Sequence, residues 1–164
     1  MRRLALVLML APLAALSGCG LQPLYQGGGQ AAVAQGLGSV EVPAIAGKAG
    51  WLMRNALTDR LGPAGDSPRY RLVVRLDDKL VGLGLLSNNT VGRERRTLRA
   101  RYQLVDVATG AVLLDATAGS DAGMDVVSSE YATVAAEQTA LENLTRVVAD
   151  RIVTNLALKL RAQR

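Results

Sequence analysis

Apolar and polar side chains alternate along two segments of this chain. In residues 69–76 the apolar side chains of the even positions are Tyr70, Leu72, Val74 and Leu76. Three odd positions of the same segment carry arginine, and these are Arg69, Arg71 and Arg75. Because successive side chains of a strand point to opposite faces of a sheet, this period of two predicts a strand with one buried and one exposed face.

Residues 93–104 show the same pattern. Their apolar even positions are Leu98, Ala100, Tyr102 and Leu104. Their odd positions carry Arg93, Arg95, Thr97, Arg99, Arg101 and Gln103. Glu94 and Arg96 interrupt the alternation, so we expect the buried part of this second strand to begin near Leu98.

Shorter signals predict the rest of the sheet. Residues 106–110, Asp-Val-Ala-Thr-Gly, have the composition of a turn and lead into an apolar segment, residues 111–117, that predicts a hairpin strand. Residues 40–43 predict a short strand that ends at Pro43, which has no N–H for a sheet. Residues 81–90 are interrupted by glycines and are expected to be irregular, and residues 118–127 are expected to be mobile.

Two segments have the spacing of amphipathic helices. Residues 50–62 place Leu52, Met53, Ala56, Leu57 and Leu61 on one side, and Gly62 followed by proline ends the segment. A longer helix is expected over residues 129–162, with Ser128 or Ser129 as its N-cap. Its apolar stripe consists of Leu141, Leu144, Val148, Ile152, Leu156 and Leu160.

The resulting order of elements is β-α-β-β-β-α. It predicts an α+β fold in which two helices pack on one face of a roughly four-stranded sheet. The other face of the sheet then remains available to water or to a partner. We expect this domain to span residues 38–164.

The first residues of the chain have the layout of a secretory signal. Arg2 and Arg3 precede an apolar run, residues 4–16, that is too short and wrongly flanked for a membrane span. Residues 16–19, Leu-Ser-Gly-Cys, resemble the lipobox of bacterial lipoproteins. The resemblance implies a signal peptide over residues 1–18 and a diacylglycerol on Cys19. Gly20, where an aspartate usually signals retention in the inner membrane, implies the outer membrane.

Cysteine usage agrees with lipidation, because Cys19 is the only cysteine of the chain. An exported protein with one unpaired thiol carries a reactive group, and acylation would consume it. Several acyl chains anchor a protein stably, since each buried methylene contributes about 0.8 kcal/mol. We expect this covalent lipid and no other cofactor. Residues 19–37, rich in Gly, Gln and Ala after the cysteine, are interpreted as the lipidated N-terminus and a flexible tether.

The composition argues against catalysis. The chain has no histidine and no second cysteine, so common metal-ligand sets, Ser-His-Asp triads and thiol chemistry lack their residues. Asp77 and Asp78 are adjacent and would point to opposite faces of a strand, where they could not share a substrate. Removal of the two signal-peptide arginines lowers the net charge from +5 to +3, which is not typical of a nucleic-acid-binding protein. We therefore expect neither an enzyme, nor a metal site, nor a nucleic-acid partner.

Three further motifs resemble the lipopolysaccharide-assembly lipoprotein family LptE, in the short form found in alphaproteobacteria. They are residues 19–25 (Cys-Gly-Leu-Gln-Pro-Leu-Tyr), residues 102–106 (Tyr-Gln-Leu-Val-Asp) before a Thr-Gly turn, and residues 128–133 (Ser-Ser-Glu-Tyr-Ala-Thr) before an alanine-rich helix. The resemblance runs in order through essentially the whole chain. It implies a lipid-anchored protein on the periplasmic side of the outer membrane that plugs and supports the β-barrel LptD. It also implies a role in delivering lipopolysaccharide to the outer leaflet and a fold of two helices on a four-stranded sheet.

The arginine-bearing strands carry the candidate site. If the strands are antiparallel neighbours, their arginines share one surface, and the candidate lipopolysaccharide-binding residues are Arg69, Arg71, Arg75, Arg95, Arg99 and Arg101. Like charges opposite one another destabilise a sheet, a cost that an anionic partner could offset. Arginine forks suit the phosphates and carboxylates of lipid A and its core sugars. Two other interpretations remain: the arginines pair with acidic groups that line the barrel, or they form a solvated face.

Two functions of other classes also remain open. One is a structural envelope lipoprotein that acts only as a protein scaffold and touches no glycolipid. The other is an envelope hydrolase, for which a pair of carboxylates would have to face each other in a deep pocket.

Overall fold

The computed structural model describes residues 29–85 and 91–163. The chain divides into two units, Met1–Ala31 and Ala32–Arg164, and the second unit contains the sheet and the long helices. The predicted signal peptide, Cys19 and the first part of the predicted tether lie outside the described residues, so these interpretations stay predictions.

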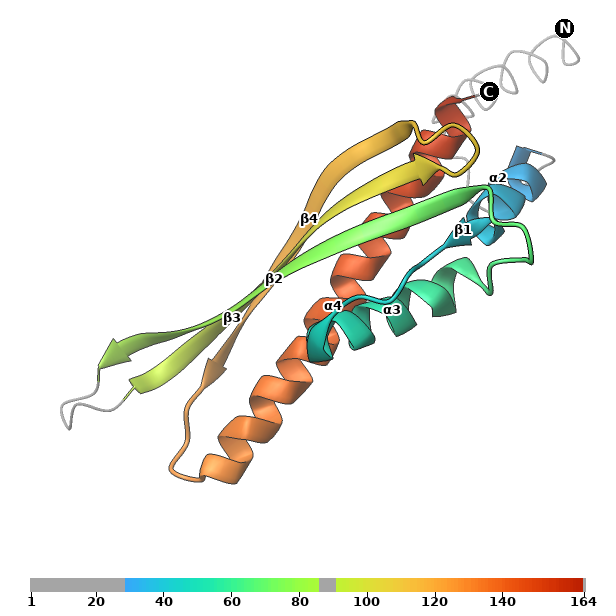
Figure 1. Ribbon diagram of the computed structural model, residues 1–164. Coiled ribbons are helices and arrows are strands. Elements are labelled where there is room, and N and C mark those ends of the chain that lie inside the picture. The colour runs from blue at the N-terminus through green and yellow to red at the C-terminus, as the bar shows by residue number, and fades with distance from the viewer. Residues whose placement is uncertain (1–28, 86–90, 164) are drawn as a thin grey trace, which may run out of the picture. The chain divides into compact units, whose positions relative to one another are not determined.

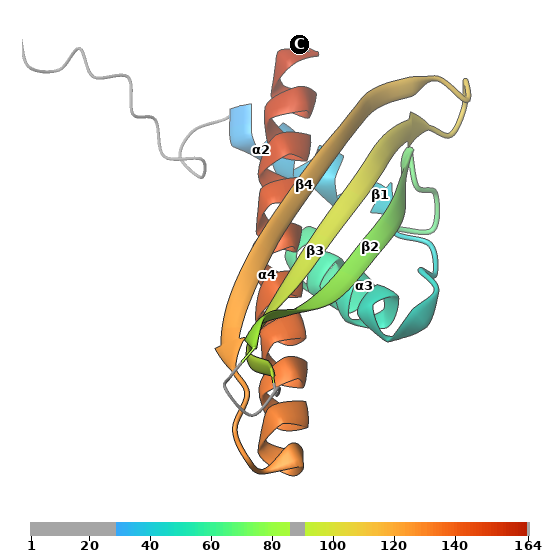
Figure 2. The same cartoon turned by 90° about the vertical axis from the view of Figure 1, so that its left-hand side faces the viewer.

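The elements follow the predicted order from β1 onward (Figure 1). They are α2 (Gly29–Gly38), β1 (Val40–Glu41), α3 (Gly47–Leu61), β2 (Tyr70–Leu85), β3 (Val91–Asp106), β4 (Val112–Asp125) and α4 (Glu130–Ala162). The sheet order is β1-β2-β3-β4, with β1 parallel to β2 and the other neighbours antiparallel. Figure 2 shows that α3 and α4 lie on the same side of this sheet. The predicted α+β architecture is confirmed.

The core lies between the even positions of the strands and one side of each helix. Leu72, Leu98, Tyr102 and Leu104 are fully buried, as the alternation predicts. The predicted stripe of the last helix is buried along its whole length, from Leu141 to Leu160. Full burial of one such aliphatic side chain stabilises the fold by about 1.5–3 kcal/mol, so this stripe is a main source of stability.

The long helix begins where the sequence predicted. Ser129 is the N-cap of α4, and its Oγ accepts a hydrogen bond from the backbone N–H of Ala132. That bond satisfies one of the first-turn donors that the helix itself leaves unpaired. Glu130 in the first turn and Lys159 and Arg161 in the last turn also complement the helix dipole.

Two strands are longer than predicted. β2 continues to Leu85, so the expected irregularity of residues 81–90 is wrong for most of residues 81–85, although Gly84 does have a positive φ of 75°. Residues 86–90 lie outside the described residues. β4 continues to Asp125, so the expected mobility of residues 118–127 is wrong for most of that segment. The sequence did not predict either extension, because both contain small residues with a weak preference for strands. Pairing with β3 along the whole length of each strand supplies the hydrogen bonds that local propensity does not.

The N-terminal boundaries also differ. α3 begins at Gly47, three residues before the predicted start. Residues 29–37 were predicted to be part of a flexible tether, but Gly29–Gly38 forms helix α2. Its alanines and glutamines favour a helix, and they were outweighed in the prediction by the glycines among them.

Candidate functional site

Antiparallel pairing of β2 with β3 gathers basic side chains on the sheet face that points away from α3 and α4, called here the outward face. Its exposed basic residues are Arg71, Arg75, Lys79, Arg93, Arg95, Arg99 and Arg101. Arg75 lies directly opposite Arg101, and Arg99 lies opposite Asp77. Five of the six candidate arginines are therefore brought together as predicted.

Arg69 is the exception. It precedes β2, and its guanidinium lies 5.1 Å from the centroid of the Tyr70 ring. Together with Tyr70 and Leu160 it lines a cavity of about 390 Å³ on the helix side of the sheet. The prediction that Arg69 shares a surface with the other arginines is wrong, because its position outside the strand frees it from the alternation.

Carboxylates on the same face were missed by the sequence analysis. The structure pairs Arg71 with Glu41 at 3.0 Å, Arg93 with Asp125 at 3.1 Å and Arg101 with Asp115 at 2.9 Å. Asp125 escaped notice because the strand that carries it was expected to end at residue 117. Asp115 lies at an odd position of β4, so the same period of two could have found it.

Arg101 and Asp115 form the most fully bonded of these pairs. Arg101 donates through Nε and Nη2 to the two carboxylate oxygens of Asp115, at 3.1 and 2.9 Å. Gln103 donates to the same carboxylate at 2.8 Å. The hydrogen bonds from Arg101 first, and from Gln103 second, lower the pKa of Asp115 to about 2. The charge of Arg101 is thus largely neutralised within the protein, which leaves it less free for an external anion.

Three arginines of the outward face have no ion pair with any residue that the structure describes, namely Arg75, Arg95 and Arg99. Arg75 lines a depression of about 180 Å³ with Val73, Arg101 and Gln103. The side chain of Arg99 passes over Gly119, where an added Cβ would lie 3.1 Å from Arg99 Cγ. These three guanidinium groups are the ones that remain available to an external anion.

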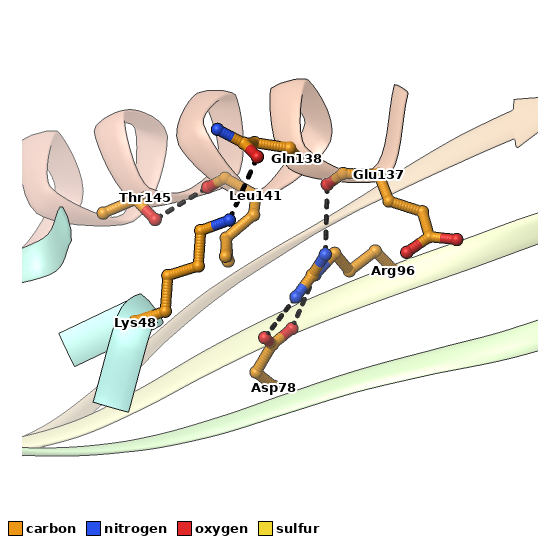
Figure 3. A network of polar contacts seen from close by, with 7 residues as sticks. All are labelled: Lys48, Asp78, Arg96, Glu137, Gln138, Leu141 and Thr145. Atoms are coloured by element: carbon orange, nitrogen blue, oxygen red, sulfur yellow. Dashed lines mark hydrogen bonds and ion pairs between the residues drawn. The ribbon is translucent and has the colours of Figure 1, made fainter. Parts of the chain in front are cut away.

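The inward face carries a second charge arrangement, between the strands and α4 (Figure 3). Arg96 donates through Nε and Nη2 to the carboxylate of Asp78, at 2.9 and 2.6 Å, and through Nη1 to the carbonyl of Glu137 on α4, at 3.0 Å. The hydrogen bond with Asp78 is the largest cause of the raised pKa of Arg96. Asp77 instead pairs with Lys79 on the outward face, so the two adjacent aspartates do point to opposite faces. Arg96 thus links the strands to the helix, and both carboxylate oxygens of Asp78 accept a hydrogen bond from it.

Other kinds of site were also sought over residues 29–85 and 91–163. No group of three or more Asp, Glu, Cys or His in this part of the chain could hold a metal ion. None of the described helices is long and apolar enough to cross a membrane. The outward face is therefore the candidate site that the observed charges support best.

A comparison with protein families matches residues 37–156 to the family described as LptE, lipopolysaccharide-assembly. No curated protein sequence matches the chain. The matched segment includes β1 to β4 and most of α4, and thus the whole outward face.

Solved structures with the same fold come from several bacteria. A protein of Caulobacter crescentus CB15, assigned as a lipoprotein, is 27% identical with a TM-score of 0.68, over 79% of this chain and 96% of that one. Rare lipoprotein B of Shewanella oneidensis is 12% identical with a TM-score of 0.59, over 76% and 97%. A lipoprotein B of Nitrosomonas europaea is 14% identical with a TM-score of 0.53, over 70% and 77%. The last two are too distant in sequence to show more than a shared fold.

Proposed function

The chain belongs to the LptE family of lipopolysaccharide-assembly proteins, and we propose that it binds lipopolysaccharide through its outward face. In this proposal the protein is anchored by a lipid on Cys19 to the periplasmic side of the outer membrane. There it plugs and supports a β-barrel of the LptD type. The observation that supports the glycolipid contact most directly is the set of three exposed arginines that have no carboxylate partner among the described residues, Arg75, Arg95 and Arg99.

The chemistry of these arginines fits an anionic glycolipid. A guanidinium presents a rigid fork of donors that matches a phosphate or a carboxylate, and lipopolysaccharide carries both groups. Arg75 and Arg101 lie opposite each other across β2 and β3, where two like charges have an energetic cost. Asp115 offsets only the charge of Arg101, so a bound phosphate would offset that of Arg75.

The proposal is tested by removing the unpaired charges together. We expect the triple variant Arg75→Gln, Arg95→Gln and Arg99→Gln to fold normally and to bind purified lipopolysaccharide at least about tenfold more weakly, the equivalent of roughly 1.4 kcal/mol. Surface plasmon resonance at two salt concentrations measures this loss. Wild-type binding should also weaken with salt, because exposed charges are screened.

Two control variants separate a specific contact from a general charge effect. Arg101→Gln with Asp115→Asn removes one internal ion pair at constant net charge and should leave binding nearly unchanged. Arg54→Gln, Arg146→Gln and Lys159→Gln remove three positive charges from the two helices rather than from the outward face. If this second control weakens binding as much as the test triple does, net charge explains the effect and the outward face is not the binding site.

The same test triple also addresses the barrel. If lipopolysaccharide binding survives but an LptD-type barrel no longer co-purifies from solubilised outer membrane, the arginines contact the barrel instead. A wild-type protein that brings down no such barrel would favour a general envelope scaffold. If neither partner is affected while the protein remains folded, the outward face is only a solvated surface.

The lipid anchor has its own test. Cys19 is the only cysteine, so Cys19→Ala should abolish labelling by a palmitate analogue in growing cells. We expect an unprocessed or unlipidated precursor. Label that persists in this variant would contradict the lipoprotein assignment of the first 19 residues.

A further inference from the structure

β4 is the last strand of the sheet, and no described strand pairs with its other edge, called here the free edge. The N–H of Val126 bonds to the carbonyl of Gly92 on β3 at 3.1 Å. The even-numbered residues of this part of β4 therefore direct their N–H and C=O groups toward β3. Because bonded and non-bonded pairs alternate in an antiparallel ladder, the odd residues of the distal part of β4 direct their N–H and C=O away from β3. These residues are Thr117, Gly119, Asp121, Gly123 and Asp125.

Only one position of this edge is covered by another element among the described residues. Arg151 of α4 donates a hydrogen bond to the carbonyl of Gly119, which agrees with the direction deduced for that carbonyl. Natural proteins usually protect a long edge strand with charges, proline, bulges or a covering segment, because an open edge pairs with other strands. Beyond Gly119 the edge of β4 continues to Asp125 with two charged residues, Asp121 and Asp125, and no described segment covers it.

A groove runs beside this uncovered part of the edge. It has a volume of about 550 Å³ and lies between residues 120–124 of β4 and residues 135–147 of α4. Small and apolar side chains form most of its lining, among them Ala122, Met124, Ala136, Ala140 and Val147. An open strand edge next to a groove along a helix is the arrangement that domains use to bind peptides by strand addition.

Charges define what such a peptide would carry. An added strand would place every second side chain over the groove and the others beside the odd residues of β4. Asp121 is exposed there and has no ion pair with any described residue, whereas Asp125 pairs with Arg93. The first set of side chains should therefore be apolar, and the member of the second set that lies beside Asp121 should be basic.

We propose that the edge of β4 from Gly119 to Asp125, with its groove, binds an extended segment of a partner protein in which every second residue is apolar and the residue beside Asp121 is basic. The segment adds a fifth strand to the sheet. This inference does not depend on lipopolysaccharide binding, because it concerns the edge and not the unpaired arginines of the outward face. The free carboxylate of Asp121 also makes this edge a poor site for a phosphate.

The probe is a synthetic heptapeptide that alternates arginine or lysine with valine, and its control is a peptide of the same composition with the valines grouped. We expect the purified protein to bind the alternating peptide at least about tenfold more tightly than the grouped one. Hydrogen exchange should slow at the N–H groups of Asp121 and Gly123, which face the free edge. The N–H groups of Ala122 and Met124 already bond to β3, so their exchange should change little.

A pair of variants at one position tests the backbone contact. Gly123→Pro removes an N–H that points to the free edge and thus no bond to β3, so the fold should be retained. Gly123→Ala keeps this N–H and has room for its Cβ, whose nearest neighbour would be the carbonyl of Glu94 at 3.9 Å. We expect the proline variant to bind the alternating peptide about tenfold more weakly and the alanine variant to bind as wild type does. Asp121→Lys should also weaken binding.

Several results would overturn the proposal. Equal binding of both peptides would indicate general charge attraction, and absence of binding up to millimolar peptide would show that the edge is closed. A proline variant with wild-type affinity would show that the edge backbone is not used. A dimer in sedimentation that Gly123→Pro abolishes would identify a second copy as the occupant. Dodecanoate binding that competes with the peptide but is insensitive to Gly123→Pro would identify an acyl chain in the groove.

Discussion

The two ends of the sheet are stabilised in different ways. At the end near β1, α3 and α4 both cover the sheet, and Met53, Leu57, Tyr102 and Ile152 are completely buried. At the opposite end only the first half of α4 covers the strands (Figure 1). There alanine side chains and the Asp78–Arg96 ion pair lie between α4 and the strands, and an open groove separates α4 from part of β4.

The second end also keeps groups in unfavourable environments. Leu80 and Val81 are 41% and 53% exposed, and no described residue bonds to the buried Oε2 of Glu94. Arg95 and Arg99, which have no ion pair with a described residue, and the free edge of β4 lie at this end. The difference indicates that the end near β1 provides most of the stability, and that the opposite end has surfaces and strand edges available for partners.

The largest effect is expected from a charge in the core of the first end. Ile152 is fully buried on α4, so Ile152→Asp would bury an unpaired carboxylate against the sheet. Such a change costs several kcal/mol, which is comparable with the total stability of a domain, and the variant should not fold. Leu158→Asp, on the same helix at 53% exposure, is the matched control and should unfold at nearly the wild-type temperature. Circular dichroism during heating measures both, and equal melting of the two variants would show that the stripe is not core.

A smaller effect is expected from the polar contact of the second end. Arg96→Leu leaves the carboxylate of Asp78 half-buried without its main partner and removes the bond to the Glu137 carbonyl. We expect a loss of about 1 kcal/mol in urea denaturation, because a partly buried carboxylate loses its charged hydrogen-bond partner. Hydrogen exchange should accelerate at this end of the sheet more than near Tyr102.

A second variant distinguishes a net contribution of the pair from the cost of breaking it. Arg96→Leu combined with Asp78→Leu replaces both charges by apolar groups that neighbour Leu80 and Leu98 in the sheet. The double variant should regain most of the lost stability, since removing both partners avoids the unpaired charge. A double variant less stable than Arg96→Leu would contradict this account of the second end.

The smallest effect is expected at the exposed pair of the outward face. The pKa of Asp115 is lowered to about 2, chiefly by Arg101, so its carboxylate should titrate near that value in an NMR titration of the folded protein. Because the folded-state pKa lies below the ordinary value of 3.8, the pair favours folding above that value, and its contribution is lost as the pH falls toward 2. Arg101→Gln should raise the pKa of Asp115 toward 3.8. An unchanged titration in this variant would show that Arg101 is not the cause.

Patterns that lie within one element could be predicted from the sequence. The alternation at Leu98, Ala100 and Tyr102 predicted their burial, because the face on which a side chain lies depends only on its position in the strand. The stripe of α4 and the Ser129 cap were likewise correct, since helical spacing and the capping bond act over a few residues. The arginines of β2 and β3 were placed on one face for the same reason, with Arg69 as the exception.

Features that join separate elements were decided only by the tertiary structure. Asp115 forms an ion pair with Arg101 and Asp125 with Arg93, whereas other arginines of the same face have no such partner among the described residues. Which arginines are paired depends on the register of β4 against β3. Gly50 was taken as the start of a helix, but it lies in the first turn of α3 and is buried against the segment that leads into the helix, where an added Cβ would lie 2.4 Å from the Ile45 carbonyl oxygen.

The length of β4 and its place at the edge of the sheet also came from tertiary contacts. Packing of Ala118 and Ala122 under α4 and pairing with β3 extend the strand through residues whose own preferences are weak. Local periodicity thus determined which face each side chain occupies, because it repeats within a few residues. Register, strand length and edge position depend on contacts between residues far apart in the chain, and these contacts arise only when the domain folds.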